Sequence, residues 1–166
     1  MKNIELFRVY LVISTKEELQ YLLHRAWEIE KKFESFTAWK SFISEKTEYR
    51  STFLTLARES YQHRLNLEKL LKILNLESPT CEIPETSFDF DSLLYSEIFE
   101  KTIEFDKMAR ELYVQILENT DSQIISSLID RNDIKFFHQQ LKQMIEDENR
   151  HIGMVKKLTG KIVRIQ

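Results

Sequence analysis

The sequence predicts an all-α fold, a four-helix bundle made of two helical hairpins that a long crossover connection joins. Three observations lead to this fold class. The 166 residues include only two Gly and two Pro, which sheet-rich folds need at their many turns. Apolar residues recur at the 3.6-residue spacing of an amphipathic helix along four long segments. Both prolines, Pro79 and Pro84, fall in one polar segment between the second and third of these.

The first hairpin is predicted to begin after Ser14 and Thr15, because Glu17 and Glu18 follow them at the spacing of a capping box. The first helix starts there, and a second is expected over 47–76. For the apolar stretch in the extension 1–14, the alternatives are an extra helical turn, a strand, and an arm exchanged with a second subunit. The inward-facing positions of the two helices are Leu19, Leu23, Ala26, Glu30, Phe33 and Thr37, then Leu56, Ser60, His63, Leu67, Leu70 and Leu74.

The crossover is predicted over 77–90, where the polar residues show no helical periodicity. A third helix is expected from about 91 to 118, and a fourth from about 133 to 158. The segment between them is expected to turn the chain, with or without a short helix. The inward-facing positions of this second hairpin are Ile98, Thr102, Phe105, Ala109, Leu112 and Ile116, then Ile134, Phe137, Leu141, Met144, Glu148, His151 and Val155.

Length, net charge and cysteine content limit the kinds of protein and of binding site that the sequence can encode. We expect one domain over 1–166, a common size for a single core. The net charge of −3 gives no reason to expect nucleic acid or an anionic membrane as a partner. The only cysteine, Cys81, excludes an internal disulfide and a four-cysteine metal site. The apolar stretch 4–13 is too short to span a bilayer and resembles no cleaved signal peptide, so we expect a cytoplasmic protein.

The two halves of the chain repeat each other. "AWEIEKKFESFT" at 26–37 aligns without gaps on "TIEFDKMARELY" at 102–113, which places Glu30 on Asp106. "HRLNLEKLL" aligns on "HIGMVKKLT", which places His63 on His151. Each half therefore carries an acidic residue on its first helix and a histidine on its second.

Helical phase separates the acidic residues that matter from those that do not. At about 100° per residue, Glu30 and Asp106 fall within the apolar stripes of their helices. Glu28, Glu34 and Glu104 fall outside them and are expected in solvent. Residues equidistant from a hairpin turn face each other, so the inward carboxylates and histidines are predicted to meet in the middle of the bundle. Burying such groups unpaired costs several kcal/mol each, and a metal cation would supply the compensating charge.

Short motifs carry a family resemblance. In the second half, "EDENRH" supplies Glu148 and His151 as Glu-x-x-His, and "DKMARELY" supplies Asp106 with Tyr113 seven residues on. These motifs resemble the rubrerythrin branch of the ferritin-like superfamily, over about residues 15–160. That family carries in each half a Glu followed seven residues later by Tyr, and then a Glu-x-x-His. The resemblance implies a ferritin-like bundle with a pair of iron ions inside it.

The first half departs from the family pattern. "EKKFESFT" supplies Glu30, with Thr37 where Tyr is usual. "ESYQH" supplies His63, but Ser60 stands where the family has a bridging Glu. Glu59 is the alternative carboxylate on this helix; it either turns in toward the site or lies in solvent.

By resemblance, the metal ligands are expected to be Glu30, His63, Asp106, Glu148 and His151, with Glu59 as the alternative, and Ser60 and Tyr113 are expected to line the site. The cofactor is then two iron ions or one, or manganese in their place. The activity would be peroxide or dioxygen reduction, or iron handling. Electrons would come from an external donor protein, because the cysteine pairs of a rubredoxin segment are missing, and a homodimer is expected.

The alternative is a metal-free helical bundle that serves as an interaction or regulatory module. Ser60 favours it, and Glu30 and Asp106 would then pair with basic side chains such as Lys101.

Overall fold

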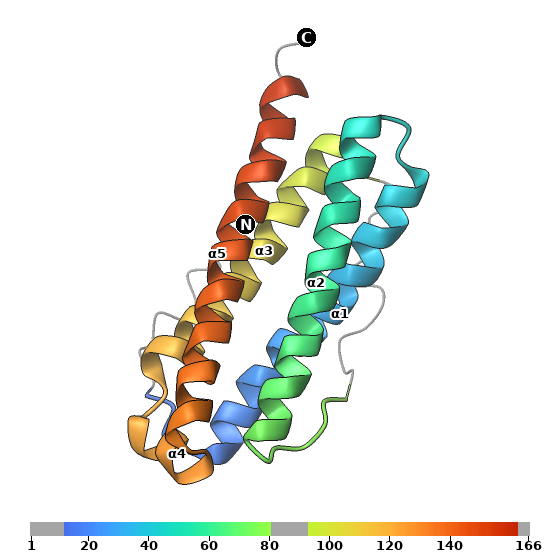
Figure 1. The fold of residues 1–166 in the computed structure, drawn as a ribbon. Coiled ribbons are helices and arrows are strands. Elements are labelled where there is room, and N and C mark those ends of the chain that lie inside the picture. Colours follow the sequence, from blue (N-terminus) through green and yellow to red (C-terminus); the bar gives the residue numbers. More distant parts are fainter. Residues whose placement is uncertain (1–11, 81–92, 163–166) are drawn as a thin grey trace.

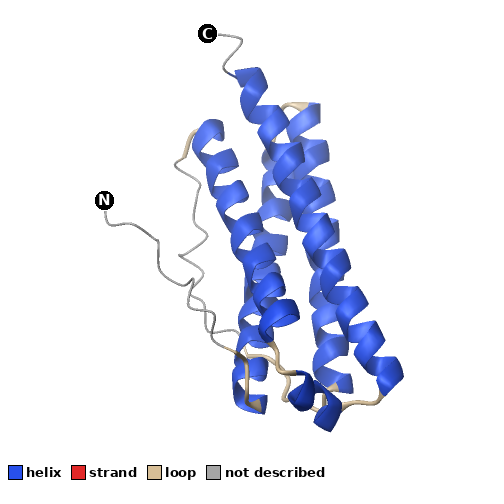
Figure 2. Ribbon diagram, turned by 90° about the vertical axis from the view of Figure 1, so that its left-hand side faces the viewer, coloured by secondary structure: helices blue, strands red, loops and turns tan. Residues whose placement is uncertain are grey.

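The computed structural model describes residues 12–80 and 93–162 and is all-helical there, apart from one isolated bridge (Figures 1 and 2). The predicted all-α class is therefore confirmed for the described residues. The predictions for residues 1–11, for Cys81 and for Pro84 concern residues outside these ranges. The helices are α1 (Lys16–Ile43), α2 (Thr47–Ile73), α3 (Tyr95–Asn119), α4 (Ser122–Leu128) and α5 (Arg131–Ile162).

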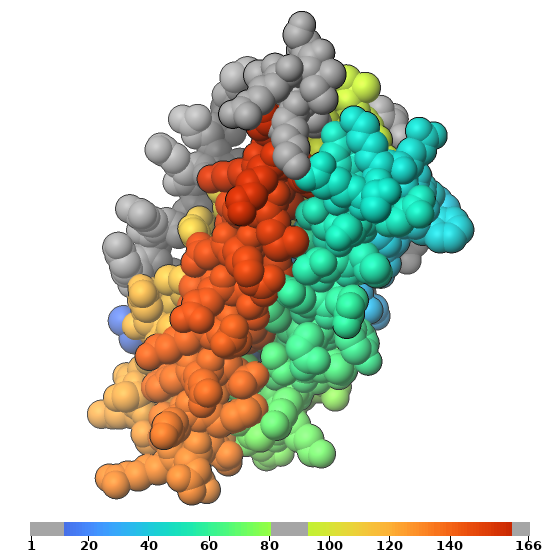
Figure 3. All heavy atoms as spheres, turned by 45° about the horizontal axis from the view of Figure 1, so that its top comes forward, coloured from blue at the N-terminus to red at the C-terminus, as the bar shows by residue number. Residues whose placement is uncertain are grey.

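The four long helices form two antiparallel hairpins, α1 with α2 and α3 with α5 (Figure 1). Helix α1 also packs on α3, and α2 packs on α5; the latter two lie side by side in the space-filling view (Figure 3). Helices α2 and α3 run in the same direction, so α2 ends at one end of the bundle and α3 begins at the other (Figure 1). The short helix α4 lies in the turn between α3 and α5.

Side-chain caps fix the helix ends. The predicted capping box opens α1: Glu18 N–H donates to Thr15 Oγ1 at 3.1 Å, and Thr15 N–H donates to Glu18 Oε2 at 3.1 Å. Helix α3 begins later than the predicted position 91, because Glu97 accepts a hydrogen bond from Leu94 N–H at 2.8 Å and caps the helix there. Helix α5 begins two residues earlier than predicted, after the Asp130 carboxylate, which accepts from two backbone N–H groups of the first turn.

The last described residues of the N-terminal extension join the two hairpins. Ile13 forms an isolated parallel bridge with Thr120: its N–H donates to Asn119 O at 2.8 Å, and its carbonyl accepts from Asp121 N–H at 3.0 Å. The start of the first hairpin is thereby tied to the turn of the second.

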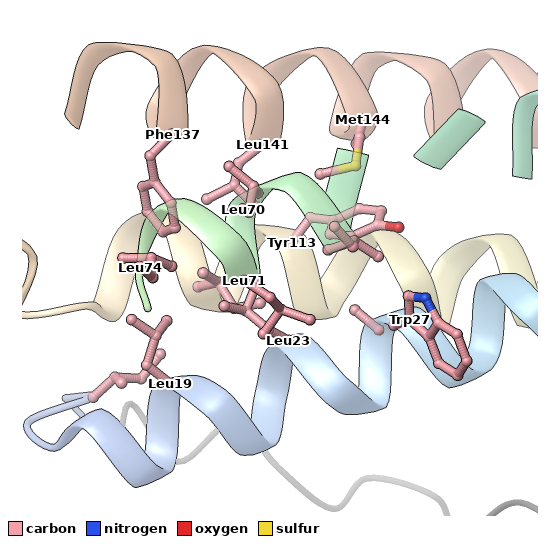
Figure 4. Packing of buried hydrophobic residues seen from close by; sticks show 14 of the residues in the cluster. Leu19, Leu23, Trp27, Leu70, Leu71, Leu74, Tyr113, Phe137, Leu141 and Met144 are labelled. Atoms are coloured by element: carbon pink, nitrogen blue, oxygen red, sulfur yellow. The ribbon is translucent and has the colours of Figure 1, made fainter. Parts of the chain in front are cut away.

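The interior consists of two apolar clusters separated by a polar layer. The first cluster packs both hairpins together at the end of the bundle near α4 (Figure 4). The second is rich in aromatic rings, among them Phe53 and Phe99 with ring centroids 5.8 Å apart. Along α1 the chain passes from Ile29 in the first cluster through Glu30 to Phe33 in the second. The other long helices make the same passage, so the polar layer lies mid-bundle.

In the described ranges, none of the helices carries an apolar stretch long enough to cross a bilayer.

Candidate metal centre

The polar layer brings together residues from all four long helices. Each of its members is only 0–2% exposed to solvent, because the apolar clusters close it off on either side. Their helical phase explains this placement, since each falls on the inward stripe of its helix. The members are Glu30 on α1, Ser60 and His63 on α2, Asp106 on α3, and Glu148 and His151 on α5.

Two groups of possible metal ligands share one residue. The first consists of Glu30, His63 and Glu148, and the second of Asp106, Glu148 and His151; within each, the ligand atoms lie within 4.8 Å of one another. Glu148 Oε1 is 2.9 Å from His63 Nδ1, and Glu148 Oε2 is 3.4 Å from His151 Nδ1. One carboxylate thus turns a different oxygen toward each group. This is the arrangement that a carboxylate bridging two cations requires.

Both imidazole rings are oriented by carboxylates on their outer side. The Nε2 atom of His63 lies 3.3 Å from Asp147 Oδ2, and that of His151 contacts Glu59 Oε2. Arg150 connects the two carboxylates, donating to Glu59 Oε2 and to Asp147 Oδ1 at 2.7 Å each. A neutral imidazole that donates from Nε2 carries a lone pair on Nδ1, and here Nδ1 of both rings faces inward. Such outer partners are typical of histidines that bind metal.

Glu59 therefore lies outside both ligand groups. It contacts the nitrogen of His151 that points away from them and is itself 30% exposed. Neither of the two alternatives for Glu59 describes this position, because the side chain lies at the outer edge of the polar layer and contacts His151, a candidate ligand.

Several buried polar atoms in the layer lack a hydrogen-bond partner within the described chain. They are both carboxylate oxygens of Asp106, His151 Nδ1 and Ser60 Oγ. An unsatisfied buried polar group costs about 1–3 kcal/mol, and more if it is charged. The three ligand-type atoms among them belong to the second group. Carboxylate oxygen and imidazole nitrogen are donors that iron and manganese accept, so these residues fit a bound transition-metal ion.

Tyr113 occupies the position predicted to line the site. Its hydroxyl donates a hydrogen bond to Glu30 Oε1, and the ring is fully buried. In the first half, Thr37 takes the equivalent place in the repeat but donates to Phe33 O at 2.7 Å in its own helix. Of these two equivalent positions, only Tyr113 therefore donates a hydrogen bond to a candidate ligand, Glu30.

Burial and charge shift the protonation of the layer. Burial raises the pKa of Glu30, although His63 opposes it. Burial and then the negative charge of Glu148 raise the pKa of Asp106 well above its usual range. Burial alone would lower the pKa of His63, but the surrounding carboxylates, with Glu30 first, outweigh it and raise that pKa. The pKa of His151 is raised in the same way by Glu148. Without a cation, the layer therefore retains protons.

These shifts predict that metal uptake releases protons. The ligands must lose the protons that their raised pKa values retain, so metal affinity is expected to increase as pH rises from about 6 to about 8. Calorimetric titrations with Mn²⁺ in buffers of different ionisation enthalpy measure the number of protons released. Equal affinity at both pH values, without proton release, would contradict this account of the layer.

No family model, curated protein or solved structure matches the chain in the comparisons with known proteins. The candidate metal centre therefore rests on the residues of the polar layer and their geometry alone.

The sequence analysis did not identify two residues that lie on the outer side of the histidines. They are Asp147 and Arg150, which lie off the apolar stripe. The available signal in the sequence is that each directly precedes a candidate ligand, Glu148 or His151, within "DENRH". The placement of Glu28 in solvent is wrong: it is 2% exposed, and Arg25 donates to it at 2.8 Å.

The other two acidic residues outside the stripes, Glu34 and Glu104, are at least partly exposed to solvent, as predicted. Glu104 is exposed as predicted, and Glu34 is part-exposed and bound by Arg64. Lys101 pairs with Glu104 at 2.7 Å. The ion pairs of Glu30 and Asp106 are with histidines. The basic partner suggested for a metal-free core is thus engaged elsewhere.

Proposed function

We propose that this chain is a ferritin-like protein, similar to rubrerythrins, that binds two iron or manganese ions in its polar layer and acts on peroxide or dioxygen. The observation that carries the proposal is the position of Glu148, whose two oxygens face two separate ligand groups. The oxygens of Asp106 and the Nδ1 atom of His151, which form no hydrogen bond in the described chain, add support.

The proposal assigns each ion a set of residues. Glu30, His63 and Glu148 would hold one ion, and Asp106, Glu148 and His151 the other. Iron bound in this way would supply two electrons, one from each Fe²⁺, which together with two protons reduce one molecule of hydrogen peroxide to two molecules of water. An external electron donor and a homodimeric assembly belong to the same proposal.

The protein's own residues have three tasks in this scheme. The apolar clusters on both sides keep bulk water away from the layer. Tyr113 holds one oxygen of Glu30 by its hydroxyl hydrogen bond. Glu59 and Asp147 keep Nδ1 of the two histidines directed inward.

A metal-free interaction module is the second candidate. Two observations favour it: Ser60 replaces a carboxylate of the family pattern, and His63 already pairs with Glu30, Glu148 and Asp147 without a cation.

Metal analysis separates the two candidates. Protein purified without chelator, loaded anaerobically with Fe²⁺ and desalted, is expected to retain about two iron ions per chain. The reduced, loaded protein should then consume peroxide. Retention of neither iron nor manganese after loading with each ion would rule out the metal centre and favour the interaction module. Iron retained without peroxide consumption would limit the function to iron handling.

A further inference from the structure

Ser60 is a buried polar residue that belongs to neither of the two proposed ligand groups. It is 1% exposed, and its Oγ has no hydrogen-bond partner in the described chain. It precedes His63 by three residues, which places both on one face of α2. The residue before it, Glu59, contacts His151 of the other ligand group. Ser60 therefore lies between residues of α2 that reach each of the two groups.

The ligand sets leave a charge uncompensated. Glu30, Asp106 and Glu148 carry three negative charges, and the two histidines bind metal as neutral rings. Two divalent ions would bring four positive charges, so the filled layer would carry an excess of one, since 4 − 3 = 1. Charge is costly in a layer that apolar clusters seal from water.

Glu59, Asp147 and Arg150 outside the histidines together carry one negative charge, since −2 + 1 = −1, but this charge lies at the edge of the layer and not inside it. Glu59 and Asp147 are 30% and 20% exposed and are both paired with Arg150. Their interaction with the layer is screened by solvent. A negative charge inside the layer would act at shorter range and in a less polar medium.

From these observations we infer that a small carboxylate anion from solution, of the size of formate, binds in the polar layer beside Ser60. The anion supplies the missing negative charge, and Ser60 Oγ–H donates a hydrogen bond to it. Serine ends one atom beyond Cβ, whereas a glutamate there would place its own carboxylate farther into the layer. The inference rests on the proposed function, since it requires both metal sites to be filled.

Titration of the metal-loaded protein with formate tests the inference. Co²⁺ serves as the probe, because it accepts the same ligands and its visible spectrum responds to a change of ligand. The bound cobalt is counted on the same samples. In the wild-type protein, formate is expected to change the cobalt spectrum saturably. Ser60→Ala should weaken formate binding roughly tenfold, as expected for one hydrogen bond to a charged group.

Two further variants complete the test. Ser60→Glu should bind cobalt but no longer respond to formate, because its own carboxylate takes that position. Ser41→Ala is the matched control, since Ser41 is also buried but donates to Ala38 O in its own helix; it should respond like the wild type. Circular dichroism verifies folding. If Ser60→Glu does not fold, the comparison of Ser60→Ala with Ser41→Ala decides.

The outcomes separate the inference from the function on which it rests. Wild-type protein that holds about two Co²⁺ but does not respond to formate would overturn the inference and leave the proposed function standing. A response to formate unchanged in Ser60→Ala would also overturn it. Protein that retains no Co²⁺ would overturn both.

Discussion

Replacing Glu148 with Gln is expected to abolish the binding of both metal ions. Its two oxygens face the two ligand groups separately, so one substitution removes a charged ligand from each. Even partners outside the ligands change metal affinity 10- to 100-fold, so we expect a loss of roughly 100-fold or more at both sites. Elemental analysis after iron loading measures it, with an expected fall from about two ions per chain to nearly none.

Three other variants sharpen this experiment. Glu30→Gln and Asp106→Asn each remove a ligand of one group and should each leave about one ion per chain. Glu104→Gln is the control, because Glu104 is an exposed carboxylate paired with Lys101, and it should bind iron like the wild type. A Glu148→Gln protein that is folded and still holds both ions would show that Glu148 is not the shared ligand.

Metal binding should also raise the thermal stability strongly. The layer without a cation contains atoms of Asp106 and His151 that form no hydrogen bond, and an ion binds them only in the folded chain. Metal at about a thousand times its dissociation constant adds about 4 kcal/mol per site to the free energy of unfolding. In a protein of this size, 1 kcal/mol raises the melting temperature by about 2–4 °C. Differential scanning calorimetry with Mn²⁺ is therefore expected to show a rise of about 8 °C or more.

Two control experiments show whether the rise in melting temperature comes from metal bound in the polar layer. Ca²⁺ should have little effect, because it binds oxygen ligands and not imidazole. Mn²⁺ should not stabilise Glu148→Gln in the same way. Equal melting temperatures of the wild type with and without Mn²⁺ would contradict a metal centre.

The inward residues could be predicted because burial in a helix follows its periodicity. Glu30 and Asp106 were singled out by phase and by the internal repeat, and both are buried in the polar layer. Glu148 and His151 followed from their three-residue spacing on a stripe with Met144. The sequence did not predict that Glu148 faces both ligand groups, because this depends on how closely the two hairpins approach each other.

Residues away from the stripes were harder to place. Glu59 lies about 100° from Ser60 around α2, and only the position of α5 brings it to His151. Glu28 is buried off the stripe and accepts a hydrogen bond from Arg25; helical phase alone does not predict such a position.

Helix ends were also harder to place, because they depend on single contacts. The inward positions after Thr37, at the end of α1, are the buried polar residues Lys40, Ser41 and Ser44, so the apolar stripe could be traced only to Thr37. The helix nevertheless continues to Ile43, and the Ser44 hydroxyl then donates to Lys40 O at its end.

The central claim is that the buried acids and histidines of four helices are there to hold cations. Anomalous diffraction from crystals grown with iron, collected on both sides of the iron absorption edge, tests it most directly. The account predicts two peaks in the polar layer, with one oxygen of Glu148 at each. Iron absent from the layer, with Asp106 and Glu148 bound to each other or to histidines only, would contradict it.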